Sequence, residues 1–142
     1  MNVLGYYLVA FAMMFAISVA NAATVEMLNK DSNGNKMIYS EEIVRVEVGE
    51  TVTWVPTSKG HNVEWIAGPD GAELPKKSKN SKEVSMTFEV PGIYYYWCTP
   101  HKGMGMIGLV VVGGDVSNKD AIAKAKALGK SKKKLKALLG EL

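Results

Sequence analysis

The stretch IYYYWCTPHKGMGMIGLVVV, residues 93–112, contains two apolar segments joined by a glycine-rich loop. The first segment, residues 93–98, follows a Pro-Gly turn and is rich in aromatic residues, which favours a strand. The second, residues 107–112, is continuously apolar and is typical of a buried strand. The stretch therefore predicts two neighbouring strands, and the loop between them holds Cys98, His101 and Met106.

Further strand-like segments precede this stretch. In residues 43–48, Val44, Val46 and Val48 alternate with charged residues and should face one side. A polar, lysine-rich connection spans residues 68–81. The other segments that alternate or have strand composition are residues 25–29, 51–55, 62–66 and 84–90. About eight short strands at this spacing predict an all-β, antiparallel Greek-key β-sandwich.

The tail, residues 117–142, has the pattern of two short helices. Ser117 can cap a first helix that ends at Gly129. Ser131 can begin a second, with Leu135, Leu138 and Leu139 on one face. We expect both helices to pack against the sandwich. A helix lying on a membrane surface is the alternative for this basic tail.

The amino-terminal segment differs from the rest. Residues 3–19 are almost uniformly apolar and are followed by Ala20-Asn21-Ala22, the small-x-small form of a signal peptidase site. We expect residues 1–22 to be a signal peptide that is removed after export. Retention as a membrane anchor is the alternative, since the run approaches the length of a spanning helix. Residues 23–142 then form one domain.

The charge of the chain excludes few functions, but it gives no reason to expect nucleic-acid binding. Seventeen basic and fourteen acidic residues give a formal net charge of +3, too small an excess for a phosphate-backbone binder. The single cysteine, Cys98, is more informative. An exported protein normally pairs its cysteines, so an unpaired thiol indicates an interchain link, a nucleophile or a metal ligand.

Every histidine and cysteine of the chain occupies a position compatible with a metal site. His101 lies three residues after Cys98, and Met106 follows in the same loop. His61, the other histidine, lies at the start of a different strand segment. Two histidines and one cysteine, with a weak methionine ligand, are typical of electron-transfer copper sites. We therefore predict one copper ion that cycles between Cu(II) and Cu(I).

Other interpretations account less well for this set. Each of these residues alone is more often structural, so the prediction rests on their joint occurrence. Zinc also binds His and Cys, but structural zinc normally has four firm ligands and a thioether is a poor fourth. A Cys-His nucleophile would need an oxyanion hole and an orienting residue, and the sequence identifies neither.

Three segments of the sequence resemble the pseudoazurins of the cupredoxin family. They are GHNVE at residues 60–64, CTPHKGMGM at residues 98–106, and VEMLNK at residues 25–30, together with the helical tail. Plastocyanins share the Cys-x-Pro-His and Gly-Met spacing. The resemblance covers essentially all of residues 23–142. It implies a cupredoxin sandwich, a type 1 blue copper centre, and a periplasmic electron carrier that is not an enzyme.

The resemblance also implies a role for individual residues. It makes His61, Cys98, His101 and Met106 the copper ligands, with Met106 rather than Met104 in the axial position. Asn62 should join the two ligand loops through hydrogen bonds to Thr99, and its N–H should reach the cysteine sulfur. Pro100, which has no N–H, should leave that sulfur without a second hydrogen bond. Trp97 is expected to point away from the copper, because strand neighbours alternate faces.

Electrons are expected to pass through the outer edge of His101. A small apolar patch that includes Met104 should surround this edge. Lysines should ring the patch and favour acidic partners, among them Lys59, Lys76, Lys77, Lys79, Lys82 and Lys102. The resemblance implies transient partners such as nitrite reductase and c-type cytochrome donors. We expect a monomer with no stable membrane association once the signal is removed.

Two other functions remain open at this point. A copper-storage or delivery protein could use the same ligands without redox turnover, although such proteins usually offer open and exchangeable sites. A metal-free adhesion sandwich would leave both histidines and the cysteine without a purpose. The closed loop from Cys98 to Met106 favours the electron carrier.

Overall fold

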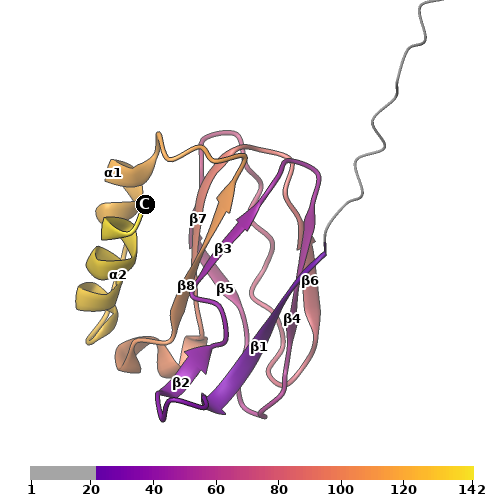
Figure 1. Ribbon diagram of the computed structural model, residues 1–142, viewed down its shortest axis with the longest axis vertical. Helices are drawn as coiled ribbons and strands as arrows, with labels where there is room; N and C mark the ends of the chain where they lie inside the picture. The colour runs from indigo at the N-terminus through magenta and orange to yellow at the C-terminus, as the bar shows by residue number, and fades with distance from the viewer. Residues whose placement is uncertain (1–21) are drawn as a thin grey trace, which may run out of the picture.

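Two four-stranded sheets pack face to face in the computed structural model, which describes residues 22–142 (Figure 1). The first sheet has the order β2-β1-β4-β6, made of Lys36–Tyr39, Ala23–Lys30, Thr51–Val55 and Val84–Thr87. The second has the order β3-β8-β7-β5, made of Ile43–Val46, Ile107–Val112, Gly92–Trp97 and Glu64–Ala67. The predicted β-sandwich is confirmed. The predicted signal peptide lies outside the described residues, apart from Ala22.

We expected wholly antiparallel sheets, and this detail was wrong. β1 pairs with β4 in parallel, and β3 pairs with β8 in parallel, while the remaining neighbours are antiparallel. In each parallel pair the connecting chain crosses between the two sheets instead of turning in a hairpin, and such crossovers allow parallel neighbours.

Two details of the strand prediction were wrong. β2 was missed because only Ile38 and Tyr39 are buried in it, so it shows no alternation, and Met37 has a positive φ of 52°. Val48 does not share the inward face of Val44 and Val46. β3 ends at Val46, and Val48 is 48% exposed before the turn at Gly49.

Two apolar clusters lie on opposite faces of the second sheet. The cluster between the sheets includes Tyr96, Cys98 and Met106, and the cluster under the helices includes Tyr95 and Trp97. Because β7 and β8 are covered on both faces, all of their residues are buried, as expected for a continuous apolar strand. Trp97 therefore points away from Cys98, as predicted.

The tail forms α1 (Lys119–Ala123) and α2 (Ser131–Gly140), which cover the outer face of the second sheet (Figure 1). The prediction for α2 is confirmed, and Leu135, Leu138 and Leu139 are buried. α1 is shorter than predicted, and Asn118 rather than Ser117 precedes it. Among the described residues, no helix is long and apolar enough to span a membrane.

Tertiary contacts account for the shorter first helix. The Asn118 side chain hydrogen-bonds both backbone groups of Ile93, at 2.9 and 2.8 Å, and so fixes the start of α1 on β7. Residues 124–130 then leave the helix and reach the loop after β7, where the Lys130 N–H donates to the Gly103 carbonyl at 3.0 Å. These contacts outweigh the intrinsic helix propensity of the segment.

Candidate metal centre

The loop between β7 and β8 brings three of the predicted ligands to one end of the sandwich. Cys98 directly follows β7 and is fully buried, and a 3-10 helix, η1 (Thr99–Met104), contains His101. Met106 immediately precedes β8 and is also fully buried. The Cys98 N–H donates to the Met106 carbonyl at 2.9 Å. This bond closes the loop, so the two sulfur-bearing residues lie next to each other in space.

His61 approaches from the loop between β4 and β5. It is fully buried, and its Nε2 lies 2.7 Å from the side-chain oxygen of Asn29 at the end of β1. An amide oxygen only accepts a hydrogen bond, so this contact places the imidazole proton on Nε2. The lone pair of Nδ1 is then free to bind a metal, and the ring is held in place.

The donor atoms of His61, Cys98 and His101 form a small triangle. The two Nδ1 atoms are 3.1 Å apart, and the Cys98 Sγ lies 3.6 Å from the His61 Nδ1 and 3.4 Å from the His101 Nδ1. One metal ion bound to all three at about 2.0–2.3 Å requires separations of this size. The cluster thus fits a single ion held by two imidazoles and a thiolate.

Burial sets the protonation of these donors. It lowers the pKa of His61, with a further contribution from His101, and it also lowers the pKa of His101. Both rings are therefore neutral near pH 7, as metal binding requires. Burial raises the pKa of the Cys98 thiol, while the backbone N–H groups of Asn62 and His101 act in the opposite direction. A bound cation would displace that thiol proton.

The backbone around the sulfur differs in part from what Pro100 suggested. The N–H groups of Asn62 and of His101 both act to lower the pKa of the Cys98 thiol. Pro100 lacks an N–H at its own position, but the tight turn of η1 brings the next amide close, where the His101 N–H donates to the Cys98 carbonyl at 3.1 Å. A sulfur with a single backbone donor stays a prediction.

Asn62 joins the two ligand loops, as predicted: the loop between β4 and β5, which holds His61, and the loop between β7 and β8. Its side-chain Nδ2 donates to the Thr99 hydroxyl at 2.9 Å, and its Oδ1 accepts from the Thr99 N–H at 2.8 Å. The buried Tyr39 hydroxyl also donates to the Asn62 carbonyl at 2.6 Å. The orientation of His61 is consequently coupled to that of Cys98 through neighbouring backbone.

Glu64 extends this network in a way that sequence reasoning missed. Its Oε2 accepts from the Thr99 hydroxyl and from the Trp97 indole N–H, each at 2.6 Å. Partial burial acts to raise the pKa of Glu64, but these hydrogen bonds and the charges of Lys77 and Lys102 outweigh it and lower the pKa overall. Glu64 therefore remains ionised and orients the Thr99 hydroxyl toward itself.

The tail also contacts the ligand loop. The fully buried Ser131 donates its hydroxyl to the Lys102 carbonyl, beside the bond from Lys130 to Gly103. Ser131 was expected only to begin α2, and nothing local in the sequence indicates this second contact. The carbonyls of η1 are thereby satisfied by a segment that is distant in sequence.

The predicted docking residues differ in exposure. Met104 is 50% exposed and His101 is half-buried, so both reach the surface at this end of the sandwich. Lys59, Lys76 and Lys77 are exposed. Lys102 is half-buried, and its ammonium lies 5.0 Å from the centre of the Trp97 ring, so that lysine already has a partner within the chain.

Comparison with known proteins identifies the family. Residues 25–113 match the model of copper-binding proteins of the plastocyanin/azurin family. A pseudoazurin from Paracoccus pantotrophus is 41% identical over 137 residues, which cover 94% of this chain and 93% of that protein. The chain belongs to the pseudoazurin family. A plastocyanin from Prochlorothrix hollandica is more distant, at 31% identity over 74% of this chain and 85% of its own.

Solved pseudoazurin structures confirm the fold and the family resemblance seen in the sequence. The pseudoazurin of Hyphomicrobium denitrificans superposes with a TM-score of 0.78 at 42% identity, over 86% of this chain and 98% of that one. The pseudoazurin of Methylobacterium extorquens AM1 gives 0.77 at 36% identity, over 85% and 98%. The predicted cofactor, copper, is that of the family, and the chain has the donor set of a type 1 site.

Proposed function

We propose that this chain is an exported electron carrier, not an enzyme, which accepts and donates single electrons through one copper ion. Its ligands are the Nδ1 atoms of His61 and His101, the thiolate of Cys98 and, more weakly, the thioether of Met106. The triangle formed by the first three donor atoms, with separations of 3.1–3.6 Å, carries the proposal. Bound copper would supply the one-electron Cu(II)/Cu(I) couple.

The protein contributes rigidity to this reaction. Asn29 fixes the ring of His61, and Asn62 locks Thr99 against the opposite loop. Because these bonds do not depend on the metal, the donors need to move little when the charge of the site changes. The same bonds favour a permanent site over the open, exchangeable ligands of a storage or delivery protein.

His101 and the exposed Met104 form the route to redox partners. His101 is the half-buried histidine of the pair, whereas His61 is fully buried and hydrogen-bonded inside. Met104 adds an exposed apolar contact beside it. A small contact of this kind suits a short-lived complex, and nearby lysines such as Lys77 would speed encounters with acidic surfaces.

We infer the setting from the family. Residues 1–22 act as a signal peptide, and the domain from residue 23 works as a monomer in the periplasm. Its acceptors include copper or haem reductases such as nitrite reductase, and its donors are c-type cytochromes. Expression of the full chain followed by intact-mass measurement of the periplasmic protein checks the export step, and the expected species begins at Ala23.

Visible absorption of the Cu(II) form tests the proposed function. The wild-type protein should show an intense thiolate-to-copper charge-transfer band with one equivalent of Cu(II), and the Cys98→Ser variant should lose it. The bound copper should also be reduced and reoxidised reversibly by voltammetry. A stoichiometric but colourless copper complex would instead favour storage or delivery.

A further inference from the structure

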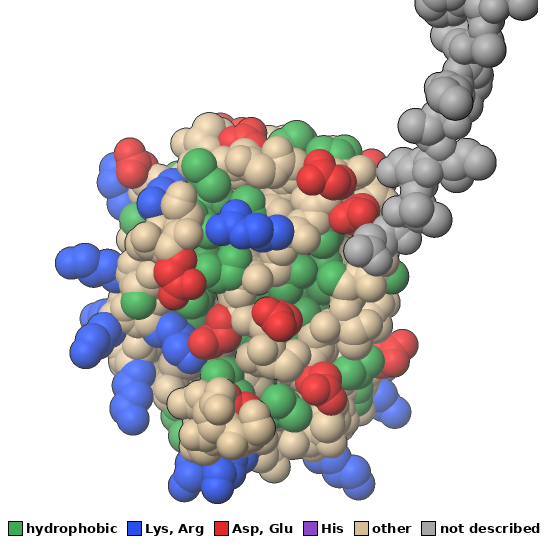
Figure 2. Space-filling view, in the orientation of Figure 1, with side chains coloured by type: hydrophobic (Ala, Val, Ile, Leu, Met, Phe, Trp, Pro, Cys, Tyr) green, Lys and Arg blue, Asp and Glu red, His purple; other side chains and the backbone are tan. Residues whose placement is uncertain are grey.

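The helical tail concentrates the positive charge of the chain. Residues 119–142 contain eight lysines and two acidic residues, whereas the chain as a whole has a formal charge of only +3. The rest of the molecule is therefore acidic on balance. Lysines lie along the flank that carries α1 and α2 (Figure 2). The function proposed above uses none of this charge, since its docking residues surround His101.

Most of these lysines are exposed and have no carboxylate partner. The exposed ones are Lys124, Lys126, Lys130, Lys132, Lys133 and Lys136. An ion pair joins the half-buried Lys134 to Glu42 in the loop before β3. The buried Leu135, Leu138 and Leu139 hold α2 on the sandwich, so the exposed lysines lie on a firmly attached surface.

The large apolar side chains of the tail are almost fully covered. Ile122, Leu135, Leu138 and Leu139 are buried under the helices. The exposed large apolar side chains of the described residues are Val48, Leu74 and Met104, all outside the tail. The tail thus presents no exposed large apolar side chain for insertion into a bilayer. It also lacks the aromatic or aliphatic anchors on which specific protein interfaces depend, and lysine is depleted in such interfaces.

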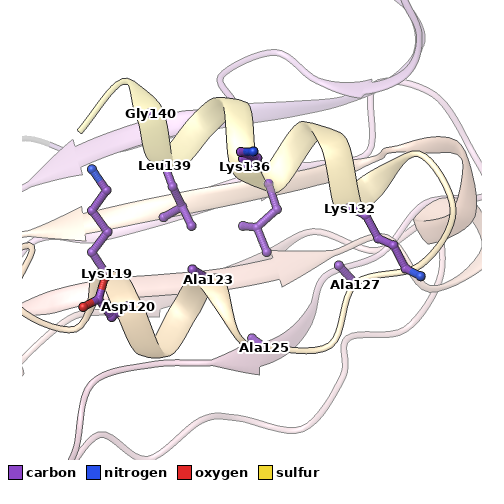
Figure 3. Close-up of a pocket in the computed structure, with 10 residues that line it drawn as sticks. Lys119, Asp120, Ala123, Ala125, Ala127, Lys132, Lys136, Leu139 and Gly140 are labelled. Carbon is purple, nitrogen blue, oxygen red and sulfur yellow. The ribbon is translucent and has the colours of Figure 1, made fainter.

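A shallow groove runs between the two helices (Figure 3). Small side chains on the α1 side, Ala123, Ala125 and Ala127, leave a space of about 640 Å³ that faces Leu135 and Leu139 of α2, so its floor is apolar. Lys119, Lys132 and Lys136 stand along it, with Asp120 as the one acidic residue in its lining. The lysines beside the groove, rather than its apolar floor, are the groups that phosphate would contact.

We propose that the tail is an electrostatic docking surface for anionic phospholipid headgroups. A headgroup layer needs only a broad array of accessible cations, and the tail offers this array without apolar anchors. The association is weak, reversible and sensitive to salt, which keeps the protein mobile. Because α1 and α2 cover the outer face of the second sheet, adsorption through them leaves the end of the sandwich that bears His101 free to meet partners near the membrane.

Vesicle binding tests the proposal with the copper-loaded domain, residues 23–142. Sedimentation is compared between vesicles of phosphatidylcholine alone and vesicles that also contain phosphatidylglycerol, at low and at physiological salt. We expect binding to the anionic vesicles only, with an affinity that falls as salt rises. Replacing Lys132, Lys133 and Lys136 together with alanine should weaken this binding on the order of a hundredfold.

A matched control variant distinguishes the effect of this surface from the effect of the net charge of the protein. Lys36→Ala, Lys79→Ala and Lys82→Ala combined remove the same charge from exposed positions outside the tail, and this variant should keep most of its vesicle affinity. Equal losses in both variants, or no binding of the wild type to anionic vesicles at low salt, would overturn the proposal. A tail variant that binds vesicles normally but reacts more slowly with an acidic redox protein would also overturn it, in favour of protein docking.

Discussion

Gly129 lies where the tail meets the ligand loop, and replacing it with alanine should perturb both. Its φ is +54°, a conformation that side chains disfavour. A Cβ at this position would also lie well inside 3.0 Å of the Gly103 carbonyl oxygen and 3.1 Å from the Gly103 Cα. These are backbone atoms of η1, so they cannot rotate away. The carbonyl of Gly103 also accepts the Lys130 N–H, which the substitution would strain.

The two costs can be estimated separately. Holding alanine at a positive φ costs about 1–2 kcal/mol. Forcing a methyl group into packed backbone costs about 1–3 kcal/mol more. Gly129→Ala should therefore destabilise the protein by about 2–5 kcal/mol. Gly114→Ala is the matched control, because Gly114 has a φ of +65° but its Cβ would meet nothing within 4 Å.

The free energy of unfolding of both variants is measured by urea denaturation of the metal-free protein, with tryptophan fluorescence as the probe. The free-energy difference between them isolates the contact with Gly103 and should be about 1–3 kcal/mol. In the Cu(II) form, Gly129→Ala should also shift the thiolate-to-copper band, while Gly114→Ala should leave it in place. Equal stabilities and identical spectra for the two variants would refute the idea that the tail positions the ligand loop.

Three other predictions concern the site. Asn29→Leu leaves the buried His61 Nε2 without an acceptor and should cost about 1–3 kcal/mol of stability and weaken copper binding, measured by unfolding and by competition with a chelator. The pKa of Glu64 is lowered in the folded state, so the ionised Glu64 stabilises the protein above its unfolded pKa, and this contribution is lost as pH falls through the folded pKa. Glu64→Gln should therefore make the free energy of unfolding depend less on pH on the acid side. An unchanged pH dependence would contradict this. Association with an acidic redox partner should slow as salt rises, and Lys77→Ala should reduce that rate at low salt more than Lys36→Ala does in stopped-flow measurements.

The local sequence pattern was sufficient to predict most of the strands and helices. It failed for the elements whose existence or length depends on tertiary contacts. β7 and β8 are visible in the sequence because burial on both faces requires uninterrupted apolar residues. β2 is not visible, since its backbone follows the edge of β1 with few buried side chains. The end of α1 is equally hidden, because it depends on where the following segment must reach η1.

The metal site also has a part that could be predicted from the sequence and a part that could not, and the reason is chemical. Few residue types can bind copper, so a chain with two histidines and one cysteine leaves little choice of ligands. The groups that orient those ligands need only a hydrogen-bonding atom in the right place, and many residues could supply one. Asn29 and Glu64 meet His61 and Thr99 only after the strands pair. The ligands were therefore predictable from their chemistry, whereas the groups that hold them rigid could be found only from the folded structure.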